Sequence, residues 1–144
     1  MSAQDNAALV RRLYDAWNNR DWETFLAAVD QDTEVLSVPT GQTFRGPQGF
    51  MQYAQSWAGA FPDARVEVSN MIVSDEGAVV EFTGRGTHTA PLTTPMGEIP
   101  ATNRRVEHPF CDVYSLRGGR VRSQHAYFDV AGLMRQLGVA PPAA

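Results

Sequence analysis

The feature that most constrains the fold of this chain is a change in the spacing of its apolar residues near Asp63. Before Asp63, apolar side chains recur every three or four positions, which is the period of an α-helix. After it, apolar and polar residues alternate, which is the period of a β-strand. Helices followed by strands are typical of an α+β domain, in which the helices pack on one face of an antiparallel sheet.

Three helices are predicted in the first part of the chain. They cover residues 5–19, 22–29 and 47–61, with a short strand at 34–38 between the second and the third. Asp21 is a good N-cap for the second helix, and Pro47 is accepted at the first position of the third. Tyr14 and Trp57 lie on the apolar stripes of the first and third helices, so both are expected to face the core.

The second part of the chain predicts an antiparallel meander and a closing helix. The strands are expected at residues 64–73, 78–88, 104–116 and 120–128, and the helix at 129–138. Residues 1–144 therefore form a single domain, predicted as a cone-shaped barrel of a curved antiparallel sheet with three N-terminal helices packed on its concave face. A ligand is expected in the concave, mostly apolar space that such a sheet encloses.

Composition narrows the classes of partner. The chain has 144 residues, 12 Lys and Arg against 16 Asp and Glu, and 43% hydrophobic residues, which is ordinary for one globular domain. A net charge of −4 gives no positive field for nucleic acid. No apolar run is long enough for a membrane span, and residues 1–6 lack a secretory pattern, so a cytoplasmic location is expected.

Metal and cofactor motifs are not found. The three histidines, His88, His108 and His125, are too far apart for a close metal-ligand pattern, and neither a dinucleotide fingerprint nor a Walker A motif occurs. The single Cys111 excludes an internal disulfide and is predicted as an inert thiol inside a strand. We therefore expect no metal and no cofactor.

The last strand carries candidate acid/base residues. Strict alternation places His125, Tyr127 and Asp129 on one side of it, pointing into the cone, with Arg122 and Gln124 on the other. A histidine and a carboxylate on one face suit general acid/base catalysis near neutral pH. Alternatively, His125 and Tyr127 are core residues, and Asp129 caps the closing helix.

The preceding strand places Asp112 on an apolar face beside Phe110. A buried carboxylate is costly unless it is hydrogen-bonded, paired or protonated. A protonated Asp112 is a candidate donor to an oxyanion, whereas the alternative has it accept backbone N–H groups or pair with an arginine. We expect Tyr14, Trp57 and Phe110 to line the same pocket. Proline at position 109 removes a backbone donor and is typical of a bulge or an edge strand, so alternation does not assign His108 to one face of the sheet.

Several blocks of sequence together resemble a known family. They are Tyr14–Asn19, Phe61-Pro62-Asp63, Gly86-Thr87-His88, Ile99–Arg104, Cys111–Leu116, Tyr127-Phe128-Asp129 and Gln136-Leu137-Gly138. The chain resembles the SnoaL-like polyketide cyclases, also called the ester cyclase group, of the nuclear transport factor two-like superfamily. The resemblance implies a cofactor-free apolar pocket, an intramolecular aldol ring closure, and a homodimer formed through the sheet.

The resemblance also assigns roles to residues. Asp129 matches the carboxylate proposed as general acid or base, and His108 matches a pocket histidine. Tyr14 and Asp112 resemble the oxyanion hole of ketosteroid isomerase, although Leu36-Ser37-Val38 stands where that enzyme has its base. Arg85 and Asp129 resemble two members of the limonene epoxide hydrolase triad, although Thr87 replaces the other aspartate.

Two classes of function stay open at this point. One is an enzyme that moves protons on an apolar carbonyl compound, with Asp129, His108 and His125 as catalytic candidates. Its substrate-binding candidates are Tyr14, Asp112, Tyr127, His88, Phe110 and Trp57, although His88 has an equally good role at a strand end. The other class is a non-catalytic module that binds a small molecule or dimerises through Pro109, Cys111 and Val113 on the outer sheet face.

Overall fold

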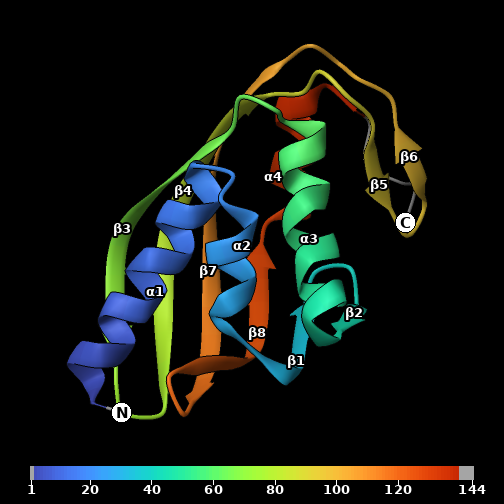
Figure 1. Cartoon of the computed structure of the whole chain (residues 1–144). Coiled ribbons are helices and arrows are strands. Elements are labelled where there is room, and N and C mark those ends of the chain that lie inside the picture. The colour runs from blue at the N-terminus through green and yellow to red at the C-terminus, as the bar shows by residue number, and fades with distance from the viewer. Residues whose placement is uncertain (1, 140–144) are drawn as a thin grey trace.

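The computed structural model describes residues 2–139 and shows helices packed against a long sheet (Figure 1). The helices are α1 (Ala3–Asn18), α2 (Trp22–Ala27), α3 (Gly46–Ala60) and α4 (Val130–Leu137). The strands are β1 (Val29–Ser37), β2 (Gln42–Arg45), β3 (Arg65–Val73), β4 (Gly77–Thr87), β5 (Leu92–Thr94), β6 (Gly97–Ile99), β7 (Arg105–Arg117) and β8 (Arg120–Phe128). The predicted α+β class is confirmed.

Local sequence explains where the helices begin. Ser2 and Asp5 form a capping box at the start of α1, with each side chain bonded to the other residue's backbone N–H. Asp21 accepts a hydrogen bond from the backbone N–H of Thr24 and so caps α2, and Pro47 lies in the first turn of α3. Within residues 2–139, no helix combines the length and the apolar character that crossing a membrane requires.

The main sheet has six strands in the order β2-β1-β8-β7-β4-β3. The prediction of a purely antiparallel sheet is wrong in one place, because β1 runs parallel to β8. A parallel pair needs a long connection, and here α3 and six further strands lie between the two in sequence. Sequence alternation also missed β2 and the two-stranded sheet of β5 and β6, whose strands are only three or four residues long.

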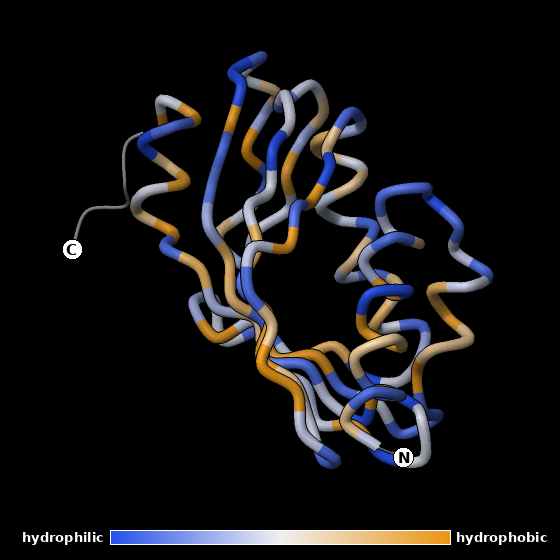
Figure 2. The backbone as a smooth tube through the Cα atoms, turned by 90° about the vertical axis from the view of Figure 1, so that its left-hand side faces the viewer, coloured by the Kyte–Doolittle hydropathy of each residue, from blue (hydrophilic) through white to orange (hydrophobic). Residues whose placement is uncertain are grey.

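The N-terminal helices cover the concave face of the sheet. In the side view of Figure 2 the strands bend around these helices, so the two layers enclose a space between them. The stripe predicted on α1 is buried there, including Val10, Leu13 and Tyr14. The β5–β6 hairpin projects away from the main sheet, as Figure 1 shows.

A β-bulge in β8 changes which residues face the helices. Gly118 and Gly119 join β7 to β8 with φ values of 59° and 74°, which is the signature of a type I′ hairpin turn. Leu116 then pairs with Val121, but Ser115 pairs with Ser123, so Arg122 is an extra residue on β8.

The extra residue reverses the alternation from that point onward. Gln124 and Ala126 are buried toward the helices, whereas His125 and Tyr127 are exposed on the other face. The prediction that His125 and Tyr127 point into the cone is therefore wrong, and its physical reason is the bulge at Arg122.

The close approach of β4 to β7 at Gly77 gives a test of this fold. A β-carbon at Gly77 would lie 2.5 Å from the carbonyl oxygen of Tyr114, whereas one at Gly59, on the exposed side of α3, meets nothing within 4 Å. We expect Gly77→Ala to lower the free energy of unfolding by about 1–3 kcal/mol. Gly59→Ala should raise it by up to about 1 kcal/mol, because alanine favours the helix. Urea unfolding of both variants measures this, and equal effects would contradict the register.

Candidate active site

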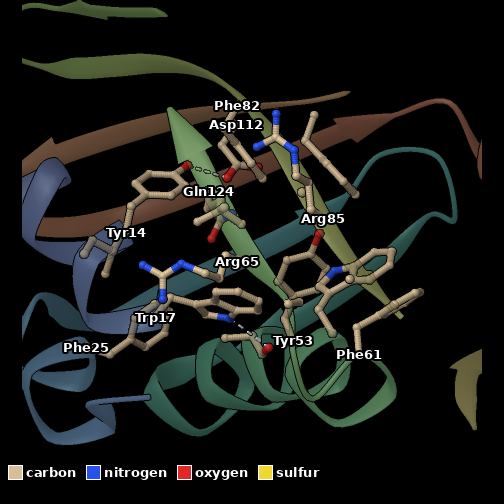
Figure 3. Close-up of a pocket in the computed structure, with 18 of the residues that line it drawn as sticks. Tyr14, Trp17, Phe25, Tyr53, Phe61, Arg65, Phe82, Arg85, Asp112 and Gln124 are labelled. Atoms are coloured by element: carbon tan, nitrogen blue, oxygen red, sulfur yellow. Dashed lines mark hydrogen bonds between the residues drawn. The ribbon is translucent and has the colours of Figure 1, made fainter. Parts of the chain in front are cut away.

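A cavity of about 110 Å³ lies between the helices and the sheet (Figure 3). Four of the predicted site residues line it, namely Tyr14, Trp57, Phe110 and Asp112. Most of the other lining residues are apolar or aromatic, and the polar ones are Tyr53, Arg65, Arg85, Tyr114 and Gln124. The cavity therefore combines an apolar wall with a few polar groups, which is the usual character of a small-molecule site.

The centre of the polar part is a cluster of one carboxylate and two phenols. The hydroxyl of Tyr14 donates to Oδ2 of Asp112 at 2.6 Å, and the hydroxyl of Tyr114 bonds the same oxygen at 3.2 Å. The two hydroxyl oxygens lie 2.8 Å apart. Because Tyr14 is on α1 while Asp112 and Tyr114 are on β7, this cluster also joins the first helix to the sheet.

Burial controls the protonation of the cluster. Asp112 is only 4% exposed, and removal of its carboxylate from water raises its pKa from 3.8 to about 6. Interactions with Tyr14, Gln124 and Tyr114 act in the opposite direction because they stabilise the charged form. Burial, and next the negative charge of Asp112, raise the pKa of Tyr14 and of Tyr114 well above the usual value. Both phenols therefore remain proton donors when Asp112 ionises.

Aromatic rings form the apolar wall of the cavity. Phe82 and Phe110 are stacked with centroids 5.2 Å apart, and the ring of Trp57 meets Phe110 edge-on at 5.5 Å. Trp57 makes a similar edge contact with Phe128 at 5.3 Å. A wall of this kind excludes water and keeps the local dielectric low, which is the condition that shifts the pKa of Asp112.

Asp129 does not line this cavity. Its carboxylate is 61% exposed, accepts a hydrogen bond from the backbone N–H of Gly132 at 3.0 Å, and lies 3.8 Å from Arg135. It is the N-cap of α4, as the alternative interpretation of the sequence predicted. The expectation that Asp129 points into the cone is wrong, since its place at the helix start turns it toward α4.

His108 and His88 are buried, but neither lines the cavity. Nε2 of His108 bonds the carbonyl oxygen of Asp129 at 2.9 Å, and the amide of Gln136 bonds Nδ1 at 3.0 Å, so the ring fastens α4 to β7. His88 accepts a hydrogen bond at Nδ1 from the backbone N–H of Thr102, and burial lowers its pKa. These contacts give both histidines a structural place, and the predicted pocket positions are wrong.

Residues that sequence reasoning did not select complete the site. Tyr114 shares the buried face of β7 with Asp112, so its alternation was a usable signal. Gln124 was placed on the wrong face because of the bulge in β8. Tyr53 and Arg65 reach the cavity from α3 and β3, and Arg85, which the sequence had matched only to the epoxide hydrolase triad, reaches it from β4. Among residues 2–139, no group of three or more histidine, cysteine or acidic side chains is placed to hold a metal ion.

The arrangement resembling epoxide hydrolase is not assembled. Arg85 pairs with Glu67 at 3.2 Å and with Glu107 at 3.4 Å, whereas the carboxylate of Asp129 is engaged at the start of α4. The arrangement resembling ketosteroid isomerase is present in part, because Tyr14 and Asp112 are in direct contact.

Comparison with known proteins identifies the family. The family described as SnoaL-like polyketide cyclase matches residues 7–137, which is most of the chain. The protein therefore belongs to this family and has the nuclear transport factor two-like fold. Among curated proteins, no relative matches.

Solved structures show the same fold at low sequence identity. A SnoaL-like protein from Jannaschia sp. CCS1 aligns with a TM-score of 0.85 and 20% identity, covering 96% of this chain and 95% of that one. TsrD from Streptomyces laurentii aligns with a TM-score of 0.82 and 21% identity, covering 97% and 99%. TerC, co-crystallised with polyporic acid, aligns with a TM-score of 0.72 and 17% identity, covering 93% and 98%.

The raised pKa of Asp112 predicts a specific pH dependence of stability. Because the folded pKa of about 6 exceeds the unfolded value of 3.8, the folded state binds this proton more tightly. The resulting stability is complete below pH 3.8 and is lost as the pH rises through 6. Relative to Asp112→Asn, the wild-type protein should therefore lose about 3 kcal/mol between these limits. Urea unfolding across this pH range measures the difference, and parallel curves would contradict the shift.

Proposed function

We propose that this protein is a cofactor-free acid/base enzyme that acts on an apolar carbonyl compound, with Asp112 as the group that moves the proton. The observation that carries the proposal is a buried carboxylate with a raised pKa that lines a mostly apolar cavity. Perturbed carboxylates in clefts are the usual acids and bases of enzymes that work near neutral pH. Membership of the SnoaL-like polyketide cyclase family supports the same reaction class.

The chemistry would begin with Asp112 as a base. Both phenols bond Oδ2, and Gln124 also interacts with the carboxylate. We assign the proton transfer to Oδ1, the oxygen that neither phenol bonds, which would take a proton from the carbon next to the substrate carbonyl. The carbon–hydrogen electron pair then forms an enolate. In an intramolecular aldol closure, the enolate carbon bonds to a second carbonyl carbon of the same molecule, and the new alkoxide takes the proton back from Asp112. No electrons leave the substrate, so the closure needs no redox partner.

The resemblance to ketosteroid isomerase predicts Asp112 as a protonated donor to an oxyanion. The proposal instead makes Asp112 the base. With a pKa of about 6, the carboxyl is ionised at neutral pH and accepts the hydrogen bond from Tyr14. An ionised carboxylate carries no proton that it could donate to an enolate oxygen. The phenol of Tyr53 lines the same cavity, and burial raises its pKa, so it remains a donor that can serve the enolate.

The cavity volume limits the substrate. A volume of about 110 Å³ is below the range of roughly 300–1,000 Å³ that is usual for sites of drug-sized ligands. We therefore propose a single-ring carbonyl compound, or the reacting end of a longer molecule.

The alternative is a binding module without catalysis. TerC, a protein of the same fold, was co-crystallised with polyporic acid, which supports the idea that the cavity of this protein holds a small molecule. Fold alone does not decide between binding and turnover, because the same fold hosts both. The two functions differ in whether Asp112 exchanges a proton with the ligand.

Deuterium exchange at the α-carbons of cyclohexanone, a single-ring ketone, tests the proposal. We expect the wild-type protein to accelerate the exchange in D₂O, followed by NMR, with a rate that rises as the pH passes about 6. Asp112→Asn should reduce the rate by about 10²–10⁴-fold, because an amide is not a base. Asp129→Asn is the matched control and should keep the wild-type rate, since Asp129 does not line the cavity.

Two results would overturn the assignment. If Asp129→Asn removed the exchange and Asp112→Asn retained it, the proton would move at the other carboxylate. If the wild-type protein bound cyclohexanone but exchanged its protons no faster than an equal concentration of acetate, the binding module would be the better description.

We also propose a homodimer formed through the outer sheet face. Ile72, Val79 and Val113 pair side by side across β3, β4 and β7, and Cys111 pairs with Tyr127 one row away. Of these residues, Ile72 is 64% exposed, Tyr127 42% and Val113 36%. Such an apolar face is costly in water, and a second copy of the same face would cover it.

Light scattering tests the dimer. We expect twice the monomer mass at micromolar protein, and Val113→Glu should shift the mass toward the monomer because it would bury a charge. Met96→Glu is the control, since Met96 is 83% exposed on the separate β5–β6 hairpin. A wild-type monomer mass that does not change with concentration would contradict the proposal.

A further inference from the structure

Arg65 lines the pocket, and its positive charge is not paired with a carboxylate in the described part of the chain. It is the first residue of β3, its side chain lines the same cavity as Asp112, and the residue is exposed to solvent. Within residues 2–139, Arg65 takes part in none of the ion pairs, whereas Arg85 beside it bridges Glu67 and Glu107. Figure 3 shows the guanidinium of Arg65 on the side of the pocket where Tyr14 and Trp17 lie.

The polar groups around Arg65 are already satisfied by other partners. Arg20 donates to the carbonyl oxygens of Trp17, Pro62 and Ala64. The carboxylate of Asp63 accepts a hydrogen bond from the backbone N–H of Thr87 at 2.7 Å. The pKa of Arg20 is lowered, first by burial and next by the charge of Arg65, whereas the charge of Asp63 acts in the opposite direction. The positive charges at this mouth therefore repel one another, and an added anion would relieve the repulsion.

From this geometry we infer that the substrate carries a carboxylate, which Arg65 binds at the mouth of the cavity while the carbonyl group lies inside beside Asp112. The guanidinium fork matches a carboxylate with two parallel hydrogen bonds. The cavity runs from the buried Asp112 to the exposed Arg65, so a ligand with an apolar ring between its two polar ends fits both.

The negative charge of Asp112 in the interior also favours a substrate whose carboxylate stays at the mouth. A substrate anion placed beside the ionised Asp112 would be repelled, whereas one held by Arg65 at the solvent edge is both paired and hydrated. Arg65 is thus a specificity-determining residue that selects an amphiphilic acid and sets which end of it enters the cavity. This inference rests on the proposed function for its carbonyl end, but its anion site is tested by binding alone.

The test compares two probes that differ only in charge, 4-oxocyclohexanecarboxylate and 4-oxocyclohexanecarboxamide. Binding of each is measured by NMR titration, and α-proton exchange is followed in the same samples. We expect the wild-type protein to bind the carboxylate at least about tenfold more tightly than the amide, as hydrogen bonds to a charged group allow. The preference should shrink as salt is added, because the mouth is exposed.

Arg65→Gln should remove the preference and leave the affinity for the amide unchanged. Arg65→Lys should restore part of it, since lysine keeps the charge but not the fork. Arg11→Gln is the matched control, because Arg11 is exposed on α1 and does not line the cavity. Equal binding of both probes by the wild-type protein, or a preference that survives in Arg65→Gln, would overturn the inference.

The outcomes separate this inference from the proposed function. If the amide exchanges its α-protons but the carboxylate gains no affinity, the acid/base function stands and the anion site falls. If the carboxylate preference depends on Arg65 but neither probe exchanges protons, the anion site stands and the proposed catalysis falls.

Discussion

The hydrogen bond between Tyr14 and Asp112 is the interaction on which the rest of the structure depends. It keeps a carboxylate inside a space that apolar rings would otherwise fill, and it does so across the junction of α1 and β7. Burial of the charge is unfavourable, and the two phenols offset only part of that cost, as the raised pKa of Asp112 shows. A structure that keeps such a group without full compensation is typical of a functional site.

The two ends of the pocket differ in charge and in exposure to solvent, and the fold determines this difference. Asp112 lies at the middle of β7, whereas Arg65 and Arg85 lie opposite each other at one end of the paired strands β3 and β4, where Arg65 is exposed to solvent. Aromatic rings occupy the length between these ends. A single cavity thus offers a negative group in a dry interior and a positive group at a wet mouth, which orients any ligand with two different ends.

The sequence predicted the layers of this fold better than its site. Period and capping residues are local signals, so α1, α2, α3 and most strands were found from the chain alone. The bulge at Arg122 depends on pairing with β7, which no local pattern reports. A signal was nevertheless present, because the apolar Val121 and Ala126 are an odd number of positions apart and cannot share a face of a regular strand. Asp129 was ambiguous because a helix cap and a catalytic carboxylate use the same residue type.

Titration of the Asp112 carboxyl carbon by NMR in the wild-type protein shows whether this carboxylate lies in a dry cavity. We expect a midpoint near 6, well above the ordinary 3.8, and a further rise in Tyr14→Phe, which removes a donor to the carboxylate. A wild-type midpoint at or below 4 would show that water reaches the carboxylate, and it would contradict a dry cavity with Asp112 as its base.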